Sequence, residues 1–147
     1  MDNWKYDAFI SYSNTEEDRT WVHFTLVPEL EKKYGFKLYI HHRDFIGGRD
    51  IADNIEDAIR QSRKVVGVIS PDFMTSNWCC TEMQMTSTID KNKIVFVKYR
   101  DVPSSIDVPF HVAYLLGNRT YIDYNENDLH SSKLFWKRLV KALFQID

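Results

Sequence analysis

The sequence predicts a single α/β domain in which one parallel β-sheet is covered by helices on both faces. Short apolar runs recur along the chain with starts 26 to 30 residues apart, the spacing that a strand–helix–strand unit requires. The middle runs are almost continuously apolar, as is typical of strands buried on both faces. Amphipathic helical patterns fill the intervals between the runs.

Each apolar run is expected to be one strand. The last run alternates polar and apolar residues, which is typical of an edge strand. The predicted strands are Tyr6–Ser11, Phe36–Ile40, Lys64–Ser70, Lys93–Tyr99 and Arg119–Asp123.

Helices are expected between these strands. One begins after Asp50, whose carboxylate can cap the first turn, and its apolar residues Ile55 and Ile59 share a face. Another is expected to kink or break early at Pro28, since proline lacks the amide hydrogen that a helix interior needs. Between Tyr99 and Arg119 the pattern supports at most a short helix. The helix that contains Pro28 is predicted over Glu17–Lys33. The remaining predicted helices are a segment from about Trp78 and Ser131–Phe144.

Composition indicates one folded domain over residues 1–147. Apolar residues make up 44% of the chain, and the net charge of −2 gives no general attraction to nucleic acid or to a membrane surface. No apolar run approaches the ~20 residues that span a bilayer, so any membrane anchor is expected outside this chain. Cys79 and Cys80 are adjacent and poorly placed to pair with each other, which favours a reducing, cytoplasmic setting.

Functional groups in parallel α/β sheets collect in loops beyond the carboxyl ends of the strands. The loop after the second strand is unusual because Phe45 and Ile46 lie at its tip, beside two glycines. Two interpretations are open: the apolar pair binds a partner, or it folds back onto the domain's own helix. The loops that qualify are Tyr12–Glu16, His41–Arg49, Pro71–Asn77 and Arg100–Pro109.

A phosphorylation-controlled receiver of the same fold class is excluded by the sequence. Such a domain needs clustered acidic residues after the first strand and an aspartate after the third. Here the third strand ends in Ile69, Ser70 and Pro71, and Asp72 alone does not supply the set.

Four short motifs stand in a fixed order along nearly the whole chain. They are YDAFISY at residues 6–12, RDFIGG at 43–48, SNWCCTE at 76–82 and the pair FW at 135–136. They resemble the three boxes and the WCxxE pattern of the Toll/interleukin-1 receptor (TIR) domain family, with the closest pattern in the Toll-like receptor group. The resemblance implies a flavodoxin-like fold whose five strands are ordered B-A-C-D-E.

The resemblance also implies a function in intracellular innate-immune signalling by homotypic assembly. Expected partners are other TIR domains, whether a second copy, a receptor or an adaptor, and a weak homo-oligomer is expected. The partner-binding loop would be Arg43, Asp44, Phe45, Ile46, Gly47 and Gly48. Two roles remain open for Arg43 and Asp44: they pair internally to shape the loop, or they steer association.

This loop departs from the family pattern at one position. The family has proline before the final glycine of its second box, where this chain has Gly47. Proline would fix φ near −65° and restrict the free loop, whereas Gly47 and Gly48 leave it more freedom. Ordering the loop in a complex is therefore expected to cost about 1 kcal/mol more.

Glu82 is the candidate catalytic residue of an alternative function. Some TIR domains cleave NAD+ at the nicotinamide bond, and a glutamate at the matching position is their catalytic residue. A carboxylate can stabilise the oxocarbenium-like sugar that nicotinamide loss produces. Receptor-type members that act as scaffolds carry this glutamate too, so a structural role is equally compatible. Ser13 and Asn14 would line the same cleft, together with Arg43.

The other singled-out residues are expected to be structural. No cofactor is required, since NAD+ would be a substrate, and no metal site is expected, because His41 and His42 lack a spaced third ligand. Cys79 and Cys80 are read as buried rather than reactive thiols. The box residues read as structural are Tyr6, Asp7, Phe9, Trp78, Phe135 and Trp136.

Overall fold

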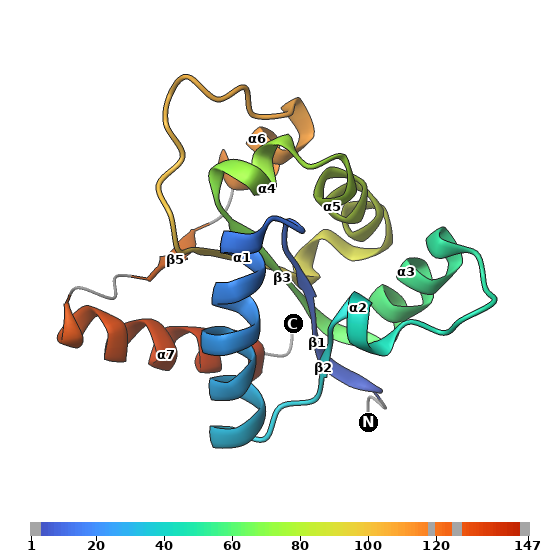
Figure 1. Cartoon of the computed structure of the whole chain (residues 1–147), viewed down its shortest axis with the longest axis horizontal. Helices are drawn as coiled ribbons and strands as arrows, with labels where there is room; N and C mark the ends of the chain where they lie inside the picture. Colours follow the sequence, from blue (N-terminus) through green and yellow to red (C-terminus); the bar gives the residue numbers. More distant parts are fainter. Residues whose placement is uncertain (1–3, 118–119, 125–127, 145–147) are drawn as a thin grey trace.

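A five-stranded parallel sheet forms the centre of the domain, in the order β2-β1-β3-β4-β5 (Figure 1). The computed structural model describes residues 4–117, 120–124 and 128–144. This order is the predicted one, so the predicted fold class is confirmed. The strands are β1 Tyr6–Ser11, β2 Leu38–Tyr39, β3 Ser62–Ile69, β4 Ile94–Lys98 and β5 Tyr121–Asp123.

Strand β2 is shorter than the predicted Phe36–Ile40. The segment before it is held by Asp7 instead, because the Asp7 carboxylate accepts from the Lys37 amide at 2.7 Å and the Asp7 amide donates to the Lys37 carbonyl at 2.7 Å. Strand β5 begins at Tyr121, and the predicted start at Arg119 lies outside the described residues.

One face of the sheet is covered by the first and last helices. The first comprises α1 (Glu16–Trp21), η1 (Val22–Leu26) and η2 (Glu29–Lys33), and the last is α7 (Leu129–Phe144). Side chains from both pack against inward-facing strand residues in one buried cluster. Of the kink or early break expected at Pro28, the break is wrong. Pro28 keeps helical backbone angles, and turns of wider π type on both sides of it continue the helix through to Lys33.

The opposite face is covered by four helices, which Figure 1 shows above and to the right of the sheet. They pack on this face through a second buried cluster, in which Phe9 of β1 and Phe96 of β4 take part. Asp50 caps α3 as predicted, accepting from the Ala52 amide at 2.8 Å. The helices are α3 (Ile51–Arg60), α4 (Pro71–Thr75), α5 (Asn77–Asp90) and α6 (Phe110–Gly117), and the short 3₁₀ turn η3 (Lys91–Lys93) follows α5.

Two of the predicted loops contain short helices. His41–Asp44 forms α2, a single turn directly after β2, and α4 occupies most of the predicted loop Pro71–Asn77. Helix α4 begins with Ser70, whose hydroxyl accepts from the Phe73 amide at 3.0 Å, followed by a proline in the first turn. Among the described helices, none combines the length and the apolarity needed to cross a bilayer.

Candidate functional site

The segment after β2 is tied to the body of the domain by Arg43. Its guanidinium makes a bidentate pair with Glu31 of η2, at 3.0 and 2.9 Å, and donates to the Leu38 carbonyl at 2.9 Å. Asp44 accepts from Arg43 at 2.9 Å and from the Ile40 amide at 2.8 Å. Of the two roles left open for Arg43 and Asp44, the structure therefore shows internal pairing, which fixes α2 against the first helix.

Beyond α2, the loop backbone is held by Asn54 of α3. This amide is buried, accepts from the Ile46 amide at 2.9 Å and donates to the Ile46 carbonyl at 3.0 Å. Both backbone groups of Ile46 are thus satisfied by one side chain from the following helix. Gly48 has φ +83°, a left-handed conformation that favours glycine, and Arg49 pairs with Asp57. Backbone freedom in this loop is therefore concentrated at Gly47 and Gly48.

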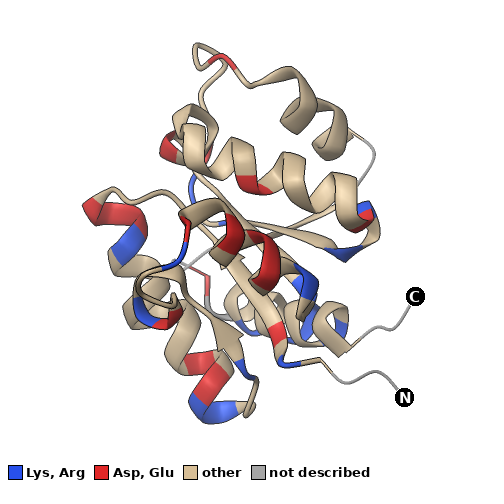
Figure 2. Cartoon of the chain, turned by 90° about the vertical axis from the view of Figure 1, so that its right-hand side faces the viewer, with Lys and Arg blue, Asp and Glu red and all other residues tan. Residues whose placement is uncertain are grey.

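Three apolar side chains stand half-exposed on this pinned segment. Phe45 is 51% exposed, Ile46 is 52% exposed, and Ile51, the first residue of α3, is 53% exposed. We call Phe45, Ile46 and Ile51 the apolar patch. Phe45 is supported by the ring of His41, with centroids 5.7 Å apart. Figure 2 shows this side of the molecule, where the acidic residues of α3 flank the loop. The patch therefore presents apolar surface beside charged residues, a composition typical of binding sites.

Glu82 lies inside the domain rather than in an open cleft. It is on α5, is only 5% exposed, and accepts from the Ser11 hydroxyl at 2.7 Å. Burial raises the pKa of the Glu82 carboxyl to about 8, although the bond from Ser11 acts in the opposite direction. A carboxyl in this position bridges α5 and β1, and a substrate could reach it only after neighbouring side chains had moved.

Ser13 and Asn14 do not line a cleft with Glu82. The Ser13 hydroxyl donates to Asp18 at 2.5 Å, and Asn14 is exposed. Asp18 is completely buried and also accepts from Ser70. Two further donors to the same carboxylate come from the end of β4, Tyr99 and Arg100. This Asp18 cluster joins the carboxyl ends of β1, β3 and β4, and the structure assigns Ser13 to it.

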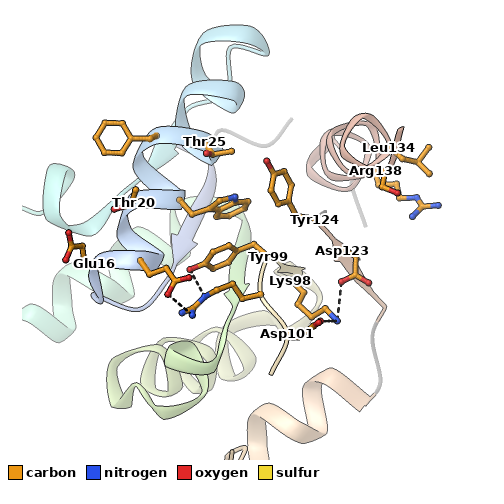
Figure 3. Close-up of a pocket in the computed structure, with 15 residues that line it drawn as sticks. Glu16, Thr20, Thr25, Lys98, Tyr99, Asp101, Asp123, Tyr124, Leu134 and Arg138 are labelled. Carbon is orange, nitrogen blue, oxygen red and sulfur yellow. Dashed lines mark hydrogen bonds and ion pairs between the residues drawn. The ribbon is translucent and has the colours of Figure 1, made fainter. Parts of the chain in front are cut away.

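A groove of about 1230 Å³ lies between the first helix and α7, at the ends of β4 and β5 (Figure 3). Lys98 points toward Asp101 at 3.0 Å and Asp123 at 3.3 Å. Arg100 pairs with Glu17, Asp18 and Asp72 at 2.8 to 2.9 Å. These two cations are therefore neutralised within the protein. Neither Glu82 nor the apolar patch borders the groove, so it is separate from both candidate sites.

The box residues divide between core and surface. Phe9 and Phe135 are fully buried, Tyr6 and Trp136 are partly buried, and Trp78 is exposed at the start of α5. Trp78 therefore lies at the surface, apart from the buried clusters that contain the other aromatic box residues. Burial raises the pKa of Cys79 to about 12 and also raises that of Cys80, which disfavours the thiolate form of both side chains. Within the described residues, no three His, Cys, Asp or Glu side chains are grouped to hold a metal ion.

The family comparison agrees with the motifs and the sheet order. The family model "TIR domain" matches residues 5–146. The chain belongs to the TIR domain family. It is 37% identical over 142 residues to Toll-like receptor 4 of Pinctada imbricata, covering 93% of this chain and 16% of that receptor. It is also 37% identical over 145 residues to Toll-like receptor 13 of Mus musculus, covering 94% of this chain and 14% of that receptor.

A solved structure shows the same fold in a related TIR domain. The TIR domain of the Toll-related receptor TRR-2 from Hydra magnipapillata superimposes with a TM-score of 0.77 and 33% identity, covering 96% of this chain and all of that one. This TIR domain spans about a sixth of the length of the curated receptors that it matches. It is therefore a TIR domain of Toll-like receptor type.

Sequence reasoning missed three residues of the loop site in this TIR domain. Asn54 holds the backbone of Ile46, Glu31 anchors Arg43, and Ile51 extends the apolar patch. Asn54 occupies a buried face of α3 beside Ile55 and Ala58, and a polar residue on such a face was the available signal. The spacing of Ile51 from Ile55 and Ile59 is that of one helix face, but as the first residue of α3 Ile51 is half-exposed.

Proposed function

We propose that this TIR domain acts in innate-immune signalling by homotypic assembly, with the loop Arg43–Gly48 as a principal contact. The observation that carries this proposal is the apolar patch of Phe45, Ile46 and Ile51, half-exposed on a segment that the domain itself holds in place. Burying such side chains against a partner releases water from apolar surface, which is the main favourable contribution to association.

The anchoring of the loop supports binding because it lowers the entropic cost of ordering. Asn54 already fixes Ile46, and Arg43 already fixes α2, so a partner does not have to order these groups. The glycines at 47 and 48 leave the end of the loop able to adjust. Replacement of the family proline by Gly47 is therefore compensated in part by side-chain contacts on both sides.

One such patch supplies only a modest association energy. Three half-exposed side chains present a small apolar area, and stable pairs of proteins bury larger interfaces. Assembly would then depend on the high local concentration that a clustered receptor or adaptor provides. The proposed partners are other TIR domains, and the proposed setting is the cytoplasmic side of a membrane, as for the receptors that this chain resembles. The proposal requires neither a cofactor nor a catalytic step.

The experiment is self-association of the purified domain, measured by sedimentation velocity over a concentration series. Phe45→Ala and Ile46→Ala should each weaken association while thermal unfolding stays unchanged, because both side chains are half-exposed. Loss of about tenfold in affinity corresponds to ~1.4 kcal/mol, a moderate value for an interface apolar side chain.

Phe110→Ala is the matched control. Phe110 is 86% exposed on α6, so its truncation removes more exposed aromatic surface than that of Phe45, from another part of the molecule. It should leave association unchanged. Equal association of Phe45→Ala, Ile46→Ala and the wild type would contradict the proposed loop contact.

A further inference from the structure

Three histidines gather where α2 meets the first helix. His23 lies on η1, and His41 and His42 form the first half of α2. The rings of His41 and His42 are 5.8 Å apart in an edge-to-face arrangement. The charge of His42 also lowers the pKa of His23. We call His23, His41 and His42 the histidine cluster.

Two members of the cluster are held by tyrosines. The Tyr12 hydroxyl is 3.1 Å from His23 Nε2, and the Tyr39 hydroxyl is 3.2 Å from His41 Nδ1. Burial raises the pKa of each tyrosine to about 12, so both remain uncharged near neutral pH. The tyrosines therefore position the imidazoles without supplying a negative charge to balance a proton.

The cluster also touches the apolar patch directly. The ring of His41 packs against the ring of Phe45, with centroids 5.7 Å apart. The ring of His41 also lies near that of Tyr39 of β2, with ring centroids 6.2 Å apart. His41 thus lies between the sheet and the side chain that the proposed contact uses.

The charged groups around the cluster are mainly cations or already paired. The positive charges of Arg19 and Arg43 both lower the pKa of His23. Asp44 and Glu31 are the nearby carboxylates from α2 and η2, and both are engaged by Arg43. Glu82 on α5 helps to raise the pKa of both Tyr12 and Tyr39. It is buried, and it accepts a hydrogen bond from Ser11.

We propose that protonation of the histidine cluster loosens α2 from the first helix and displaces Phe45, so that assembly weakens in mildly acidic solution. This inference rests on the proposed function, because it concerns regulation of the same loop. A protonated His23 on the first helix is repelled by His42 and Arg43 of α2, and moving α2 outward relieves this repulsion. Phe45 directly follows α2, so the same movement displaces its side chain together with the helix.

The direction of the pH effect follows from burial. Burial, and then the neighbouring His42, lower the pKa of both His23 and His41 below the usual 6.5. The folded state therefore favours the neutral imidazoles. At a pH below the usual histidine pKa of about 6.5, the arrangement with α2 displaced binds more protons than the arrangement with α2 packed against the first helix. Lowering the pH therefore disfavours the packed arrangement.

The first experiment follows dilute, monomeric protein by NMR from about pH 7.5 to about pH 5.0. The ring signals of the three histidines give their midpoints, and the backbone amides of Phe45 and Ile46 report on the loop. The amides should shift with the same midpoint as His23 or His41. Loop amides that stay constant while the histidines titrate would overturn the proposal.

The second experiment measures self-association by sedimentation at the same two pH values. The dissociation constant should rise about tenfold from the higher to the lower pH in the wild type, and less than about threefold in His42→Gln. His130→Gln is the matched control, because His130 is exposed on α7, and it should behave as the wild type. An equal pH dependence in His42→Gln and the wild type would overturn the proposal.

The two experiments separate this inference from the proposed function. If Phe45→Ala leaves assembly unchanged but the loop amides still titrate with the histidines, the contact is elsewhere and the pH-dependent movement stands. If Phe45→Ala weakens assembly but neither the amides nor the affinity respond to pH, the contact stands and the histidine cluster is no switch.

Discussion

Glu82→Gln should make this TIR domain more stable at neutral pH. The carboxyl is buried between α5 and β1, and burial raises its pKa from 4.5 to about 8. Glutamine has the same shape and cannot ionise, and its carbonyl oxygen can still accept from the Ser11 hydroxyl, 2.7 Å from Glu82 in the wild type. The substitution therefore removes a cost of ionisation without removing the hydrogen bond.

The size of the effect follows from the difference in pKa between the folded and unfolded states. Above about pH 4.5 the unfolded chain releases the Glu82 proton, whereas the folded domain keeps it up to about pH 8. The contribution of Glu82 to wild-type stability is therefore greatest below pH 4.5 and falls as the pH rises through this window. At pH 7 the loss amounts to ~3 kcal/mol, taking about 1.4 kcal/mol for each unit of pKa.

The assay is urea unfolding of both proteins at a series of pH values between about 4.5 and 8. The difference in the free energy of unfolding between Glu82→Gln and the wild type should grow by ~3 kcal/mol from pH 4.5 to pH 7. Glu56→Gln is the matched control, since Glu56 pairs with Arg60 on the surface of α3 and such pairs contribute ~1 kcal/mol or less.

Parallel stability curves for Glu82→Gln and the wild type would refute the reasoning. They would mean that Glu82 is already ionised in the folded domain, and therefore that it is more accessible to water or to a ligand than the structure shows. That outcome would favour the catalytic interpretation of this residue.

Three further predictions concern the loop, the Asp18 cluster and catalysis. Gly47→Pro should tighten self-association by ~1 kcal/mol, measured by sedimentation, because proline restricts the free loop. Proline fits at this position, since a side chain at Gly47 meets nothing within 4 Å and φ of Gly47 is not left-handed. Weaker association would contradict this prediction. Asp18→Ala should lower the free energy of unfolding, measured in urea, by ~3–5 kcal/mol. The substitution leaves Arg100 and the hydroxyls of Ser13 and Ser70 without their shared acceptor. A loss under ~1 kcal/mol would contradict this prediction. Concentrated wild-type domain should release no nicotinamide from NAD+, because Glu82 is buried; release that disappears in Glu82→Ala would make the domain an enzyme.

The sheet could be predicted because strands covered on both faces must be apolar along their whole length. Runs such as those in β3 and β4 satisfy this requirement over many residues, so their periodic spacing alone indicated the α/β class. The strand order came from the family resemblance, since spacing does not determine which strands are neighbours. Helix α4 had an available signal in Ser70 and Pro71, a cap followed by proline, whereas the single turn α2 has no apolar periodicity.

The contacts that shape the loop could not be predicted, because they join residues far apart in the chain. Nothing in the sequence pairs Arg43 with Glu31, and the spacing within α3 does not reveal that Asn54 turns back to Ile46. Asp18 is one of three consecutive acidic residues in the first turn of α1, and nothing in the sequence distinguishes it from Glu16 and Glu17. It is nevertheless completely buried, and donors from three strand ends converge on it. Burial of Glu82 was hidden for the same reason, because its motif fixes its place on α5 but not its surroundings.

The most direct test of the loop contact is amide hydrogen exchange, measured on dilute protein and on concentrated, assembled protein. The proposal predicts that assembly slows exchange over residues 45–51, the segment that carries the apolar patch, while α6 exchanges equally in both states. Protection that appears elsewhere on the domain, with exchange over residues 45–51 unchanged, would contradict the central claim that this loop is the contact.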